Sequence, residues 1–145
     1  MAAEETVQQF LEHAGIAHKR IDDTHWVAQL AGERKLAIPL AISITGGRVG
    51  FESFFMRRPQ ENEDRFYELL LRRNARTYGV HFALDAIGDV YLVGACPTAG
   101  LDEDELDRIV GSILVEADGM FNAAIEVGFA TYLEADRRWR ATATE

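Results

Sequence analysis

Residues 102–129 read DEDELDRIVGSILVEADGMFNAAIEVGF and predict the helix around which the fold is built. The apolar residues of this stretch recur every three or four positions, which is the spacing of one helical face: Leu106, Ile109, Val110, Ile113, Leu114, Ala117, Met120, Phe121, Ala124 and Ile125. Such a helix would be about 42 Å long, enough to cross a whole β-sheet. The acidic run 102–105 suits its start, because negative charge is favourable there and Asp102 can cap the first turn.

The segments before this helix predict two more helices and five strands. Helix periodicity covers 3–14 and 62–76, and strand patterns cover 24–30, 36–45, 48–57, 80–85 and 90–97. We therefore expect one α+β domain over 1–145, with its core at about 4–129 and an antiparallel sheet packed with helices. The expected order is α-β-β-β-α-β-β-α. The tail 130–145, which contains Tyr132 and Trp139, is predicted either to pack on the body or to extend from it.

The predicted strand 36–45 is apolar on both faces, as in a strand covered on two sides. Pro39 conflicts with a central position, because proline has no N–H for the ladder. We therefore expect a bulge or a local sheet edge at Pro39.

The composition excludes some classes of function. The formal charge of −9 argues against nucleic-acid binding, which needs clustered Lys and Arg. Cys96 is the single cysteine, so no intramolecular disulfide is possible, which suits a reducing compartment. No signal peptide and no run of about 20 apolar residues is visible. We expect a soluble, cytoplasmic protein that does not enter a membrane.

No motif for catalysis or cofactor binding stands out. The glycines at 46–50 lie between two predicted strands and indicate a hairpin turn, whereas a phosphate loop leads into a helix. The four histidines lack the spacing of metal ligands. Cys96 and His81 could pair as nucleophile and base, but Cys96 shares a strand face with Val90 and Leu92, which favours a core position. We predict no catalytic residue, cofactor or metal, and no enzyme activity.

Four blocks of the sequence carry a family resemblance. They are FFMRRPQEN at 54–62, LLRRNARTYG at 70–79, FALDAIGDVYLVG at 82–94 and EADGMF at 116–121. With the order of elements, they resemble the YbjN family over residues 4–140. The family is similar in fold to type III secretion chaperones, which are usually dimeric and hold an extended segment of another protein. The resemblance therefore implies this fold and, more weakly, a homodimer that binds a protein partner.

The second predicted helix carries more apolar residues than one core face needs. Five of the six positions 66–71 are apolar, and a twofold dimer would use the surplus once per subunit. In the resembling fold this helix lies at the dimer interface, which implies an interface role for Phe66, Tyr67, Leu70 and Leu71. The alternative is a helix buried on two sides within one chain.

Two further groups are candidates for partner binding. Gly111, Val115 and Gly119 form a stripe on the back of the long helix, and its glycines, each costing about 1 kcal/mol against alanine, suggest a close neighbour. A kink at 118–119 is the alternative. Trp26, Phe51 and Phe54 could line a groove for an extended peptide, or could be core residues.

These features favour a non-enzymatic binding module, a chaperone-like dimer that holds a segment of a partner protein. The alternative is a regulatory or structural subunit that binds one folded partner. The sequence does not name the partner.

Overall fold

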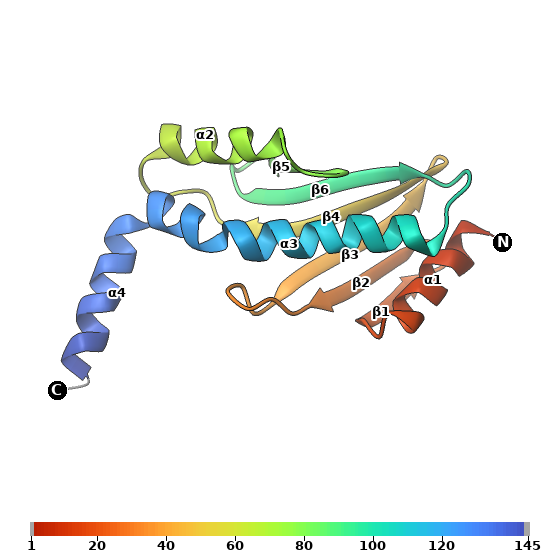
Figure 1. The fold of residues 1–145 in the computed structure, drawn as a ribbon, viewed down its shortest axis with the longest axis horizontal. Coiled ribbons are helices and arrows are strands. Elements are labelled where there is room, and N and C mark those ends of the chain that lie inside the picture. The colour runs from red at the N-terminus through yellow and green to blue at the C-terminus, as the bar shows by residue number, and fades with distance from the viewer. Residues whose placement is uncertain (1, 144–145) are drawn as a thin grey trace.

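A six-stranded sheet forms the centre of the computed structural model, which describes residues 2–143 (Figure 1). The strands lie in the order β1-β2-β3-β4-β6-β5, and every neighbouring pair is antiparallel. The elements are α1 (Ala3–His13), β1 (Ala17–Asp22), β2 (His25–Leu30), β3 (Ile38–Thr45), β4 (Arg48–Met56), α2 (Glu63–Asn74), β5 (Val80–Leu84), β6 (Val90–Pro97), α3 (Glu103–Gly128) and α4 (Ala130–Ala143). The predicted α+β class and the order of the predicted elements are confirmed, and β1 and α4 are additions.

One face of the sheet is covered by helices, and the core lies between them. Helix α3 runs across this face, α1 packs beside it near β1, and α2 contacts α3 and β5 (Figure 1). Alternate strand residues point into this layer, as the period of two in a strand requires. The largest fully buried side chains are Trp26, Phe55, Phe66, Leu11, Ile38, Leu40, Ile42, Leu92, Leu106, Ile109, Ile113 and Val7.

Strand β1 is the strand that sequence patterning missed. Its residues AHKRID are mostly polar and exposed, so the alternation of apolar and polar residues that marks a half-buried strand is absent. It pairs with β2 alone and ends in a register shift between Arg20 and Asp22. Charged residues and an irregularity are common on edge strands, where they discourage pairing with other molecules.

Pro39 lies where β3 has a ladder on one side only. The β2–β3 ladder runs without a bulge from His25–Ser43 to Leu30–Ile38, whereas the paired residues of β3 and β4 begin at Ala41–Glu52. The Pro39 carbonyl instead accepts a hydrogen bond from Ser53 Oγ at 2.5 Å. The expected local edge is therefore present, and the expected bulge is not.

Two aspartates fix α3 to its surroundings. Asp102 caps the helix, since its Oδ1 accepts a hydrogen bond from the Glu105 N–H at 2.8 Å, as predicted. Asp118 Oδ1 accepts hydrogen bonds from the N–H groups of Arg34 at 2.6 Å and Lys35 at 3.0 Å. These backbone N–H groups, with the Arg34 charge, lower the pKa of Asp118. The loop between β2 and β3 is thereby held against α3.

Helix α4 leaves the body at a joint fixed by hydrogen bonds. The Gly128 carbonyl accepts from the N–H groups of Gln60 at 2.9 Å and Glu61 at 3.2 Å. The Glu61 carboxylate accepts from the Thr131 N–H at 2.6 Å and from Thr131 Oγ1 at 3.0 Å. Helix α4 has no buried residue and projects away from the sheet (Figure 1). The tail therefore extends as a helix, apart from residues 144 and 145, which lie outside the described residues.

Candidate binding surface

No helix within residues 2–143 covers the second face of the sheet, which we call the open face (Figure 1). The strand registers align one row of its side chains across the whole sheet, in the order Lys19, Val27, Ala41, Glu52, Val93 and His81. A neighbouring row contains Gln29, Pro39, Phe54, Tyr91 and Ala83. Val27 is 45% exposed although it lies on an inner strand of the sheet. Most of these side chains are small or apolar, so the open face has the character of a binding surface.

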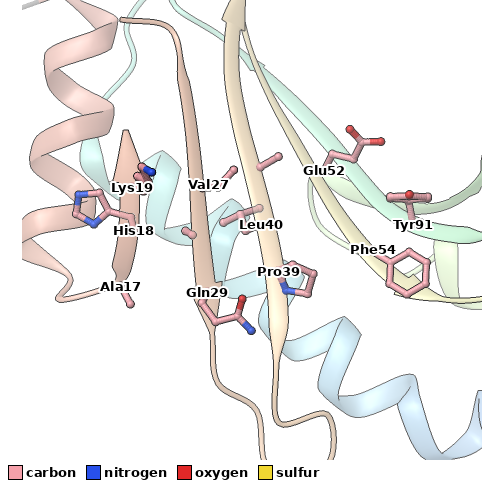
Figure 2. Close-up of a pocket in the computed structure, with 12 residues that line it drawn as sticks. Ala17, His18, Lys19, Val27, Gln29, Pro39, Leu40, Glu52, Phe54 and Tyr91 are labelled. Atoms are coloured by element: carbon pink, nitrogen blue, oxygen red, sulfur yellow. The ribbon is translucent and has the colours of Figure 1, made fainter. Parts of the chain in front are cut away.

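Two shallow grooves lie on the open face. The first has a volume of about 560 Å³ and runs from β1 to β6 between Lys19 and Tyr91. Figure 2 shows its lining, with Val27, Pro39 and Leu40 between Lys19 on one side and Glu52, Phe54 and Tyr91 on the other. The second groove has a volume of about 600 Å³ and lies over β3, β4, β6 and the start of β5. Together they offer an extended chain a long, mostly apolar track.

An aromatic pair with acidic surroundings borders the first groove. The rings of Phe54 and Tyr91 meet edge to face with centroids 5.5 Å apart. Burial raises the pKa of Tyr91, and the negative charges of Asp85, Glu52 and Asp89 raise it further. The Tyr91 hydroxyl therefore stays protonated at neutral pH and can donate a hydrogen bond. The negative surroundings favour a basic group near this pair.

The structure does not bring the three predicted groove aromatics together. Trp26 and Phe51 lie on the covered face and are 1% and 2% exposed. The Trp26 Nε1–H donates a hydrogen bond to Gln8 Oε1 on α1 at 2.9 Å, as in a core residue. Phe54 alone lies on the open face, because adjacent strand residues point to opposite sides. Trp26 and Phe51 therefore have no surface to offer a partner in this conformation.

The predicted dimer residues divide between core and surface. Phe66 and Leu70 are 0% and 4% exposed and pack in the core, so this half of the prediction is corrected by their burial. Tyr67 is half-buried and Leu71 is 68% exposed. Both line a groove of about 270 Å³ between α2 and β5, together with the exposed Leu84. We call Tyr67, Leu71 and Leu84 the α2 patch.

The stripe on the back of α3 faces solvent. No side chain or distant backbone atom lies within 4 Å of a Cβ placed on Gly111 or Gly119, and Val115 is 61% exposed. The expected close neighbour is therefore not part of residues 2–143. Helix α3 is continuous through 118–119, and the alternative of a kink there stays a prediction.

The considered nucleophile and base lie on opposite faces of the sheet. Cys96 points into the core beside Val49, whereas His81 is exposed on the open face beside Val93. Burial, and then the negative charge of Glu105, raise the pKa of the Cys96 thiol, which disfavours the reactive thiolate. Within residues 2–143, no group of three or more His, Cys, Asp or Glu side chains could hold a metal. No helix in the same range is long and apolar enough to cross a membrane.

Sequence reasoning missed Glu52, Tyr91 and the small residues of the open face. The available signal was the segment 36–45, which is apolar on both of its faces. We interpreted this pattern as a strand whose two faces are both covered by other parts of the protein. In the structure the second apolar face, at Pro39 and Ala41, is exposed.

Comparison with solved structures defines the class of fold. The ExoU–SpcU heterodimeric complex from the type III secretion system of Pseudomonas aeruginosa contains a chain that superposes with a TM-score of 0.60 at 17% identity, over 80% of this chain and 95% of that one. The HopA1–SchA chaperone–effector complex gives a TM-score of 0.59 at 14% identity, over 82% and 92%. YbjN from E. coli gives 0.58 at 15% identity, over 83% and 91%. The fold is therefore that of type III secretion chaperones.

The sequence then places the chain within a family. Residues 4–126 match the YbjN family, described as "Putative bacterial sensory transduction regulator". Uncharacterized proteins of Mycobacterium bovis and Mycobacterium leprae are 42% and 39% identical over 119 residues, which is 82% of this chain. The match spans 65% of the length of these relatives. The chain belongs to the YbjN family, as its four sequence blocks predict.

Proposed function

We propose that this protein is a non-enzymatic binding module that holds a segment of a partner protein on the open face of its sheet. The observation that carries the proposal is a sheet face with small and apolar side chains that no helix within the described residues covers. The structural relatives in complexes with protein partners support it, since they show that this fold can serve such binding.

Burial of partner side chains in the two grooves would drive binding, with no covalent step. Each fully buried apolar side chain contributes about 1.5–3 kcal/mol. The free energy gained by burying two or three such side chains must exceed the entropic cost of ordering an extended segment. Polar groups at the groove margins, among them Lys19, Gln29 and Glu52, would fix the orientation of the segment.

Replacing Ala41 by arginine should abolish partner binding without unfolding the protein. Ala41 is exposed at the centre of the open face and borders both grooves, so a long charged side chain there blocks them. Asp107→Arg is the matched control, because it makes a larger charge change at an exposed position on α3, on the other side of the molecule. The protein, tagged at its N-terminus, would be crosslinked in its host to identify a stoichiometric partner.

Hydrogen exchange on the purified complex then shows how the partner is held. Protection of one extended partner segment, lost with Ala41→Arg and kept with Asp107→Arg, supports the proposal. Protection spread over a folded partner domain would favour the alternative, a regulatory subunit that binds one folded partner. Binding that survives Ala41→Arg would contradict a role for the open face.

We further propose that the α2 patch is the contact of a homodimer. Leu71 is 68% exposed and lies beside Tyr67 in an apolar groove, so a second copy of α2 could bury both. Leu71→Glu should convert a dimer to a monomer in light scattering, because it places a charge in the centre of the contact. Arg65→Glu is the control, because it changes the charge at an exposed position on a different side of α2 from Tyr67 and Leu71. A dimer that persists in Leu71→Glu would rule out this patch.

A further inference from the structure

Helix α4 is an exposed helix that leaves the body of the protein at a joint fixed by hydrogen bonds. The hydrogen bonds that Thr131 donates to Glu61, and those that the N–H groups of residues 60–61 donate to the Gly128 carbonyl, set the direction in which it leaves. Its two large aromatic side chains, Tyr132 and Trp139, are 59% and 69% exposed. The helix lies beyond residues 4–126, which match the family, so its role need not be shared with other members.

The aromatic residues of α4 lie on one side of the helix. Tyr132, Ala135, Trp139 and Ala143 recur at intervals of three and four, which places them on a common face. Arg138 and Arg140 flank Trp139, each in an exposed ion pair with an acidic residue one turn earlier. Such pairs contribute little to stability, so these arginines are free to change partner. Helix α4 thus presents two exposed aromatic side chains and flanking arginines on its surface.

The first groove of the open face matches α4 in length, and beside its one cation, Lys19, it offers one carboxylate to the arginines of α4. Helix α4 has 14 residues and is about 21 Å long at 1.5 Å per residue. The first groove spans the five strands from β1 to β6, about 19 Å at the usual strand spacing. Its one carboxylate, Glu52, makes no hydrogen bond or ion pair with any residue in 2–143, and it lies near the Phe54–Tyr91 pair.

We propose that α4 of one copy docks on the open face of a second copy. Trp139 packs beside Phe54 and Tyr91, and a flanking arginine pairs with Glu52. If partner segments bind the open face as proposed above, α4 of the second copy occupies the same surface, and a partner must displace it.

Quenching of tryptophan fluorescence by acrylamide tests the docking on the full chain. Trp26 is 1% exposed and stays protected at every protein concentration, so the quenchable signal comes from Trp139. This signal should disappear as concentration rises and light scattering detects association. Trp139→Ala should weaken association at least about 30-fold, since buried interface tryptophans contribute about 2 kcal/mol or more. Glu52→Arg should weaken it from the receiving side and leave Trp139 quenchable.

Arg137→Ala is the control, because Arg137 lies on nearly the opposite side of α4 from Trp139 and should leave association unchanged. A Trp139 that stays quenchable at every concentration overturns the docking, as does unchanged association in Trp139→Ala and Glu52→Arg. If Leu71→Glu abolishes the dimer and Trp139→Ala and Glu52→Arg do not, self-association uses the α2 patch alone and the docking of α4 is rejected. Partner binding that is sensitive to Ala41→Arg, with Trp139 always quenchable, would retain the proposed function and reject the docking.

Discussion

Phe55→Ala should lower the free energy of unfolding by about 3–5 kcal/mol, the usual result of removing a buried phenylalanine. Phe55 is 1% exposed on the covered face of β4. Its ring meets Phe82 of β5 edge to face with centroids 5.0 Å apart, and Phe121 of α3 with centroids 6.4 Å apart. The substitution therefore leaves a cavity between the sheet and α3. Urea unfolding followed by circular dichroism measures the loss.

Phe54→Ala is the matched control for Phe55→Ala. The two residues are adjacent and of the same type, but Phe54 is half-buried on the open face. We expect it to lower stability much less and to weaken partner binding instead, because its ring borders the first groove. Equal destabilisation by both substitutions would mean that the open face is packed as tightly as the core, and would contradict the surface described here.

Arg73→Ala should also lower the free energy of unfolding, by about 1–3 kcal/mol, because it leaves the buried Glu116 carboxylate without its partner, while the Arg73 side chain itself is 36% exposed. Glu116 on α3 is 4% exposed. Its two carboxylate oxygens accept hydrogen bonds from Arg73 Nε at 2.7 Å and Nη2 at 2.8 Å. The same hydrogen bonds, and then the negative charge of Glu116, raise the pKa of Arg73. Chemical unfolding at pH 7 gives the value.

Arg72→Ala compares the partly buried Arg73–Glu116 pair with an ordinary surface pair. Arg72 precedes Arg73 on α2 and bonds Glu68 at 2.7 Å, with both side chains exposed. An exposed pair at this spacing is worth less than about 0.5 kcal/mol. Joint replacement, Arg73→Met with Glu116→Leu, should cost less than Arg73→Ala alone, because no charge is then left buried. If Arg73→Ala and Arg72→Ala had the same effect, the Arg73–Glu116 pair would not join α2 to α3.

Strong periodicity made much of the fold predictable. The pattern in 102–129 predicted α3 to within a residue of its observed bounds, and Asp102 was correctly identified as its cap. Strand β1 was missed because sheet pairing, and not apolar burial, defines it, and pairing leaves no trace in a polar segment such as AHKRID. The direction of α4 depends on hydrogen bonds between residues 70 positions apart.

The candidate site was less predictable, for a related reason. Alternation assigns residues to two faces of a strand, but it does not say which face the helices cover. Both faces of β3 are apolar, so Ile42 and Ala41 look alike in the sequence although one is 1% exposed and the other faces solvent. Trp26 and Phe51 were proposed for a groove because large aromatic residues suit either a core or a binding surface. The position of α3 decides which strand residues lie in the core and which lie on the open face.

The order of strands in the sheet also affects how the chain assembles. Strands β1 to β4 pair with their neighbours in sequence, and β5 pairs with β6, so both groups can form from nearby residues. The β4–β6 ladder that joins the groups pairs Met56 with Val90, and residues 57–89 must first close into a loop. Loop closure costs entropy before any contact is gained, so this ladder is expected to form late. Substitutions that weaken contacts needed to close the 57–89 loop would then mainly slow folding. Substitutions that weaken contacts formed after the loop has closed would mainly speed unfolding.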